Sequence, residues 1–445
     1  MTTDIWGYAL TNASAETARR YETAVGLMNA YQADPVAAID GLLADQPDFI
    51  MGHAFRAAAL ALAADKAFEP ELARNLAAAE ALADRANDRE RGHIAAVRAW
   101  LDGDLAGATE TWGRVAIDYP RDIAALQFAQ LGDFYLGYSP MLRDRVARVL
   151  PHWTPSVPGY GYVLGMYAFG LEENAEYTRA EQIGRQAVDL NRQDAWGAHA
   201  VAHVMEMQGR TAEGSAWLRD TAAGWAPDGL FAFHNWWHLA LLGLESGDPR
   251  PALQVFDEKI AAGGFGQALE LVDGTALLWR LHVLGHDVGQ RWITVAEKWL
   301  TRISDGLYAF NDLHAMMALV GAGWRSEQSA LLQTMRAAAA GRGTNGMMTR
   351  EVGLPAALAV QAFGHGHYAE AADLLLSVQG KANRFGGSHA QRDIVSWTLT
   401  ETAIRAGDQP LAAAVAAERL ARKPMSPLNR NWAQRAAALG KRRAA

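Results

Sequence analysis

The hexapeptide GDPRPA, Gly247–Ala252, recurs in variant form along this chain. Each copy has a glycine, or once an alanine, followed five positions later by a small residue. Glycine tolerates the left-handed conformation that ends a helix, and the small residue lets the next helix approach closely. The pattern therefore predicts helix pairs that repeat along the chain. The other copies are GDLAGA (103–108), GHYAEA (366–371), GDQPLA (407–412), the close variant GRTAEG (209–214) and the looser AEYTRA (175–180).

These units resemble the tetratricopeptide repeat, an antiparallel helix pair of about 34 residues. That repeat has a second small residue earlier, on the first helix of each pair. The alanines that occupy this position are Ala96, Ala168, Ala202, Ala240 and Ala359. We therefore predict an all-α fold, an α-solenoid of tetratricopeptide-like antiparallel helix pairs that forms a superhelix with a concave inner pocket.

Composition supports this fold and excludes several function classes. The chain has 445 residues, of which 50% are hydrophobic and 20% charged, and it contains no cysteine. Disulfides, thiolate nucleophiles and cysteine-ligated metal centres are thereby excluded. A net charge of -8 without a broad basic stripe argues against nucleic-acid binding. No signal peptide and no uncharged apolar stretch of about 18 residues is visible, so we expect a cytoplasmic protein without a membrane partner.

Two segments interrupt the repeat pattern, although we expect the solenoid itself to be continuous. A segment rich in proline and glycine cannot continue a helix, so it marks a linker or loop. Ser388 followed by Gln391 predicts a capping box that opens a helix. The predicted parts are N-terminal repeats at 1–150, a Pro/Gly-rich linker at 151–163, central repeats with the pocket at 164–338, a loop at 339–353 and C-terminal repeats at 354–445.

Polar residues of the central repeats fall on one predicted face. In tetratricopeptide units the first helix of each pair lines the concave side, and the alanines set its phase. Adjacent helices lie about 8–10 Å apart, so these side chains can meet. Each histidine could instead bond a backbone carbonyl, and Glu172 and Glu173 could be a solvated helix end. The residues assigned to this face are Glu172, Glu173, His199, His203, Glu206, His234, Trp237 and His238.

Longer runs are more specific than the repeat itself. They include DAWGAHAVAHVMEMQGR (194–210), FHNWWHLALLGLESGD (233–248), LVDGTALLWRL (271–281) and GGSHAQRD (386–393). Together they resemble the tetratricopeptide repeat protein 38 family, from about Tyr31 to Arg419. The resemblance implies the fold, little about biochemical function, and an enclosed pocket rather than a plain peptide groove. The residues it singles out are His199, His203, Glu206, His234, Asn235, His238, Asp273, Trp279, Arg280, His389, Gln391 and Arg392.

The spacing of the histidines is compatible with a metal site. His199 and His203 lie one helical turn apart, Glu206 could join them, and His234 with His238 repeat the spacing. The familiar HExxH pattern is absent, because Ala200 follows His199. We therefore expect no metal and no other cofactor, with a metal at His199, His203 and Glu206 as the weaker alternative.

We predict that the pocket binds a small polar ligand or a peptide partner. The predicted ligand-binding residues are Glu172, His199, Asn235, Trp237, His238, Trp279, Arg280, His389 and Arg392.

The alternative is a cofactor-free, or less favoured metal-dependent, hydrolase or lyase. His203 or His234 would then be the general base, oriented by Glu206 or Asp273. The ligand, the reaction and a homo-oligomeric state are left open.

Overall fold

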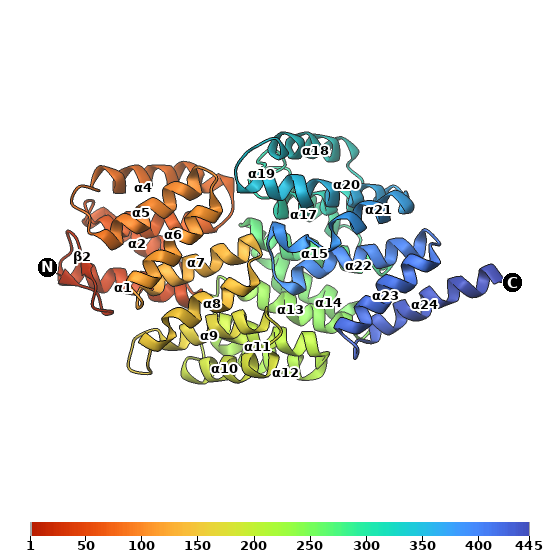
Figure 1. Cartoon of the computed structure of the whole chain (residues 1–445), viewed down its shortest axis with the longest axis horizontal. Helices are drawn as coiled ribbons and strands as arrows, with labels where there is room; N and C mark the ends of the chain where they lie inside the picture. The colour runs from red at the N-terminus through yellow and green to blue at the C-terminus, as the bar shows by residue number, and fades with distance from the viewer. Residues whose placement is uncertain (1, 445) are drawn as a thin grey trace. The chain divides into compact units, whose positions relative to one another are not determined.

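The computed structural model, which describes residues 2–444, is built almost entirely of helices (Figure 1). The predicted all-α fold is confirmed. The chain forms two compact units, Met1–Val201 with Arg219–Ala232 (unit 1) and Ala202–Leu218 with Phe233–Ala445 (unit 2). The predicted superhelix and its inner hollow stay predictions.

Unit 1 begins with a short antiparallel pair of strands and continues as helices. Consecutive helices pack on one another, as α3 does on α4 and α9 on α10, so each pair buries a shared apolar stripe. Its elements are β1 (Thr2–Thr3), β2 (Ala9–Leu10), α1 (Ala15–Ala30), α2 (Pro35–Asp45), α3 (Ile50–Leu62), η1 (Lys66–Phe68), α4 (Glu69–Ala81), α5 (Asp88–Leu101), α6 (Leu105–Asp118), α7 (Ile123–Leu136), α8 (Ser139–Val149), η2 (Leu150–His152), α9 (Tyr160–Glu172) and α10 (Tyr177–Leu190).

Unit 2 continues the pattern of paired helices. Helices α11 (Ala195–Gln208) and α12 (Thr211–Trp225) run without a break through the division and contribute residues to both units. The other elements are α13 (Ala232–Leu244), α14 (Arg250–Val255), η3 (Phe256–Ile260), η4 (Ala261–Gly263), α15 (Ala268–Val283), α16 (Arg291–Trp299), α17 (Ala309–Gly321), α18 (Arg325–Ala339), α19 (Thr344–Met348), η5 (Thr349–Gly353), α20 (Leu354–Gly364), α21 (Tyr368–Gln379), η6 (Ala382–Phe385), α22 (His389–Arg405), α23 (Gln409–Arg422) and α24 (Pro427–Ala444).

The repeat register is confirmed at two positions, the first residue of the turn motif and the small residue on the first helix of each pair. The glycines that open the repeated motif have positive φ angles, for example +83° at Gly103 and +69° at Gly407. In the looser motif Ala175 takes the same conformation, with φ +61°. The alanines of the first helices are buried, which is what close helix packing requires. They are Ala96, Ala168, Ala202, Ala240 and Ala359, each at most 1% exposed.

Helix starts follow the local sequence. The Ser388 hydroxyl accepts a hydrogen bond from the Gln391 backbone, and the Gln391 side chain caps in return, which confirms the predicted capping box. The same box forms at Asn87 and Glu90, ahead of α5. These caps satisfy backbone groups that a helix leaves unpaired at its first turn.

The predicted loop at 339–353 is wrong over most of its length, because α19 and η5 make residues 344–353 helical. Its glycines serve close packing. A Cβ at Gly346 would lie 2.2 Å from the Gly341 carbonyl oxygen, and one at Gly353 would lie 2.8 Å from Ala309 Cβ. Gly346 and Gly353 therefore allow close contacts within a helical segment rather than a flexible turn.

The segment 151–163 lies inside unit 1 and is not helical between η2 and α9. Trp153 is buried, and its indole nitrogen donates to the Pro120 carbonyl over 2.9 Å. The segment is thus an anchored loop within one unit.

Within residues 2–444, none of the helices combines the length and the apolar character that crossing a membrane requires.

Ala175→Gly should stabilise the protein by about 0.5–1 kcal/mol. The left-handed conformation costs a residue other than glycine about 1–2 kcal/mol in the folded state, and glycine removes this cost. Glycine also makes the unfolded chain more flexible, which cancels about 0.4–1 kcal/mol of the stabilisation. Equilibrium urea denaturation measures the change. Gly103→Ala is the matched control, because a Cβ there meets nothing within 4 Å. The G103A variant should be less stable than the parent. An A175G variant that is no more stable than the parent would contradict the strain argument.

Candidate functional site

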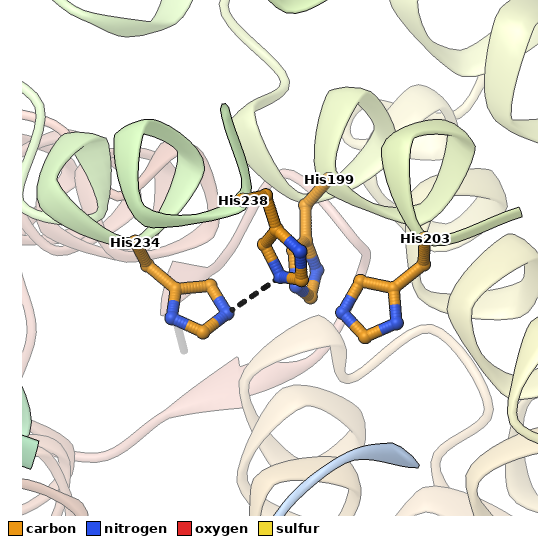
Figure 2. Close-up of side chains that lie close together, drawn as sticks. All are labelled: His199, His203, His234 and His238. Carbon is orange, nitrogen blue, oxygen red and sulfur yellow. Dashed lines mark hydrogen bonds between the residues drawn. The ribbon is translucent and has the colours of Figure 1, made fainter. Parts of the chain in front are cut away.

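Two helices carry the histidines of the candidate site. His199 and His203 lie one turn apart on α11, and His234 and His238 lie one turn apart on α13. All four are buried, with at most 6% of each residue exposed. His203, His234 and His238 each have a ring nitrogen within 4.8 Å of a ring nitrogen of the other two, as Figure 2 illustrates. His203, His234 and His238 belong to unit 2, and we call these three the histidine cluster.

Two carboxylates hold the rings of α13 in place. The Nδ1 atom of His234 lies 2.6 Å from Asp273 Oδ2 on α15, and the Nδ1 atom of His238 lies 3.1 Å from Glu206 Oε2 on α11. The two Nε2 atoms then face each other at 3.2 Å, the dashed contact of Figure 2. The His203 ring lies against His238, with 4.3 Å between ring centroids. Each carboxylate therefore orients one imidazole toward the centre of the cluster.

The carboxylates are anchored in turn. Glu206 Oε1 accepts from the Lys423 ammonium over 3.0 Å, and Lys423 caps the end of α23. Asp273 Oδ1 lies 3.5 Å from the Gln391 amide, in the capping box of α22. The C-terminal helices α22 and α23 of unit 2 thus support residues that come from α11 and α15.

Burial and neighbouring charges shift the pKa values of Glu206 and Lys423 in opposite directions. Burial raises the pKa of the Glu206 carboxyl, but Lys423 and His203 outweigh it and hold that pKa below its ordinary value. Burial lowers the pKa of Lys423, but Glu206 and Asp393 raise it above the ordinary value. The pKa of His238 falls well below its ordinary value because of burial, reinforced by His203 and His234. His238 is therefore neutral at neutral pH, beside a charged Lys423–Glu206 pair.

A cavity of about 220 Å³ opens in unit 2 beside this pair. Its floor includes the buried Lys423 and Arg419, and its rim includes the exposed Arg422. The predicted residues His389 and Arg392 also line it. The full lining is Met207, Gln379, Gly380, Ala382, Asn383, His389, Arg392, Asp393, Val395, Ser396, Arg419, Arg422, Lys423 and Asn429.

Sequence reasoning missed the residues that form the cavity floor. Arg419 binds Asp393 over 2.8 and 3.1 Å and also bonds Asn429 and Ser396, so its donors are engaged in holding α22, α23 and α24 together. Asp393 is the last residue of the conspicuous run GGSHAQRD, which was the available signal. A lysine at a helix end has no local signature of burial, so Lys423 could not be found from the sequence.

Several predicted ligand residues have packing roles. Trp279 is buried and donates to the Thr398 hydroxyl over 3.0 Å. Arg280 donates to the Ala276 and Ala390 carbonyls over 3.2 and 2.5 Å. Burial lowers the pKa of Arg280 to about 10, which leaves it charged at neutral pH.

Tryptophans surround the Arg280 guanidinium. It lies 5.2 Å from the centre of the Trp237 ring and 5.6 Å from that of Trp397. Trp237 is fully buried, as is its neighbour Asn235. The aromatic rings thus pack around a cation of the chain itself.

Glu172 and Glu173 lie at the end of α9 in unit 1. They are 0% and 3% exposed, so the alternative of a solvated helix end is wrong.

No protein-family model matches this chain, so its resemblance to the tetratricopeptide repeat protein 38 family stays a prediction. Similar solved structures include yeast Tom70, at 11% identity and a TM-score of 0.33, over 96% of this chain and 89% of that chain. A monomeric mutant of IFIT1 with m7Gppp-AAAA is 14% identical, with a TM-score of 0.34 and 95% of each chain covered. At such low scores the helical-repeat description rests on this chain's own helices and buried register.

Lys423→Met should destabilise the protein by about 3–5 kcal/mol, because it leaves the Glu206 carboxylate nearly buried without its cation. The double variant E206Q/K423M should lose clearly less, since it removes both charges. Urea denaturation of the single and double variants measures the coupling. Arg422→Met is the control, because the Arg422 side chain, next to Lys423 in the sequence, is exposed and should contribute less than about 1 kcal/mol to the free energy of unfolding. Equal losses of stability in K423M and R422M would show that the ion pair between Lys423 and Glu206 is not required for stability.

Proposed function

We propose that the cavity of unit 2 binds a small anionic molecule. The observation that carries this proposal is the charge of the lining. Arg392, Arg419, Arg422 and Lys423 surround the space, and Asp393 is the lone carboxylate among the lining residues. A concave site lined by one sign of charge concentrates ligands of the other sign.

The cations divide into those that build the site and those that face it. Arg419 is engaged by Asp393 and Asn429. Lys423 has three N–H donors, of which one bonds Glu206, so it can also donate to a bound anion. Arg422 makes a long, exposed ion pair of 3.8 Å with Glu418. Carboxylate and phosphate groups match the donors of lysine and arginine, which favours ligands of these two kinds.

The volume favours a metabolite over a peptide. Drug-sized ligands occupy pockets of about 300–1,000 Å³, and the cavity holds about 220 Å³. At about 30 Å³ for each water molecule, that is room for about seven waters. An extended peptide would need a longer groove.

A second candidate is general acid–base chemistry by His234. The 2.6 Å contact with Asp273 is the feature that favours it, because a carboxylate at Nδ1 orients an imidazole as a base. His234 is only 6% exposed and is not among the residues that line the cavity. Binding is therefore preferred to catalysis as the function of the site.

R392Q/R422Q should weaken the binding of succinate or inorganic phosphate at least tenfold, because two of the four cations that line the cavity are lost. Isothermal titration calorimetry at low ionic strength measures it, since exposed charges are screened by salt. Arg336→Gln on α18 is the matched control, an exposed arginine outside the lining. If neither anion binds the parent protein, or if R392Q/R422Q binds as the parent does, the proposal is rejected.

A further inference from the structure

We propose that the histidine cluster, His203, His234 and His238, binds one divalent transition-metal ion of the zinc type. This centre is separate from the anion cavity and goes beyond the proposed function. It also departs from the expectation of no cofactor.

The spacing of the nitrogens fits such an ion. A tetrahedral ion with metal–nitrogen bonds of about 2.0–2.1 Å holds its ligand nitrogens about 3.3–3.4 Å apart. The Nε2 atoms of His234 and His238 are 3.2 Å apart. His203 has a ring nitrogen within 4.8 Å of a ring nitrogen of each of the other two histidines, and it would supply the third ligand. The fourth position is left to a water molecule.

The hydrogen bonds set the chemistry of these nitrogens. A carboxylate can only accept, so the Nδ1 atoms of His234 and His238 carry the protons that point at Asp273 and Glu206. In a neutral ring the proton at Nδ1 leaves a lone pair at Nε2. With both rings neutral, each Nε2 can offer its lone pair to a cation placed between the two atoms, which are 3.2 Å apart.

The carboxylates behind the rings are the usual support of a metal-binding histidine. Such a residue commonly donates its second ring N–H to a carboxylate, which fixes the ring and raises its basicity. Asp273 has this position behind His234, and Glu206 has it behind His238. Glu206 is thus assigned to the support of a ligand and not, as in the sequence-based alternative, to the metal itself.

The type of ligand atom limits which metal ions this site can bind. Imidazole nitrogens without thiolates suit zinc, copper and nickel, whereas magnesium and calcium prefer oxygen. The Asp273 carboxylate behind His234 would offset part of the charge of a buried dication, whereas Glu206 is already paired with Lys423.

Zn²⁺ titration of the untagged, chelator-treated full chain tests the proposal. Calorimetry should give one ion per chain, and Co²⁺ should show the visible absorption of a tetrahedral centre. H203A and H238A should each weaken binding at least 100-fold, because each removes a ligand. His314→Ala is the control, a buried histidine of unit 2 whose Nδ1 bonds the Phe310 carbonyl. It should bind Zn²⁺ as the parent does.

Asp273→Asn keeps the test decisive if the histidine variants fail to fold. It should weaken Zn²⁺ binding about 10–100-fold, the usual effect of removing such a support. Asp312→Asn, at another buried aspartate of unit 2, should leave affinity unchanged. A parent protein that binds no Zn²⁺ at one per chain, or D273N and D312N variants with equal affinity, would overturn the proposal and leave a hydrogen-bonded histidine cluster.

Discussion

The close approach of paired helices at small residues is the constraint on which the rest of this structure depends. Ala168, Ala202 and Ala240 are buried where a larger side chain would hold neighbouring helices apart. Once those alanines face a partner helix, the phase of every other residue on the same helix is set by the turn of 3.6 residues. His203 and His238 are therefore directed by residues that carry no chemistry themselves.

Burial of so many polar groups then demands partners, and these come from distant parts of the chain. Asp273 meets His234 across two helices, and Lys423 reaches Glu206 over 217 positions of sequence. Each pairing offsets the cost of removing a charged group from water. Because Lys423 also lines the cavity, an anion bound there would touch the same network that orients His238.

Aromatic residues show how closely a functional and a packing role resemble each other in sequence. Trp237 lies on the same helix as the histidines, yet its ring packs over the Arg280 guanidinium, 5.2 Å away. Its neighbour Trp236 is half-buried, with the Lys259 ammonium 5.3 Å from its ring centre. Neighbouring positions on a helix differ by about 100° in direction, so a shift of one residue in the predicted register would exchange their roles.

The sequence alone determined the all-helical class, the left-handed turns such as that at Gly103, the buried alanines and the one-turn spacing of His234 and His238. These properties are local, because they depend on residues within one or two turns. Tertiary structure alone decided that Asp273 and Glu206 stand behind the imidazoles and that Lys423 joins the cluster to a cavity. The rotations and separations of packed helices set those contacts, and they depend on side chains from the whole unit, which periodicity does not encode.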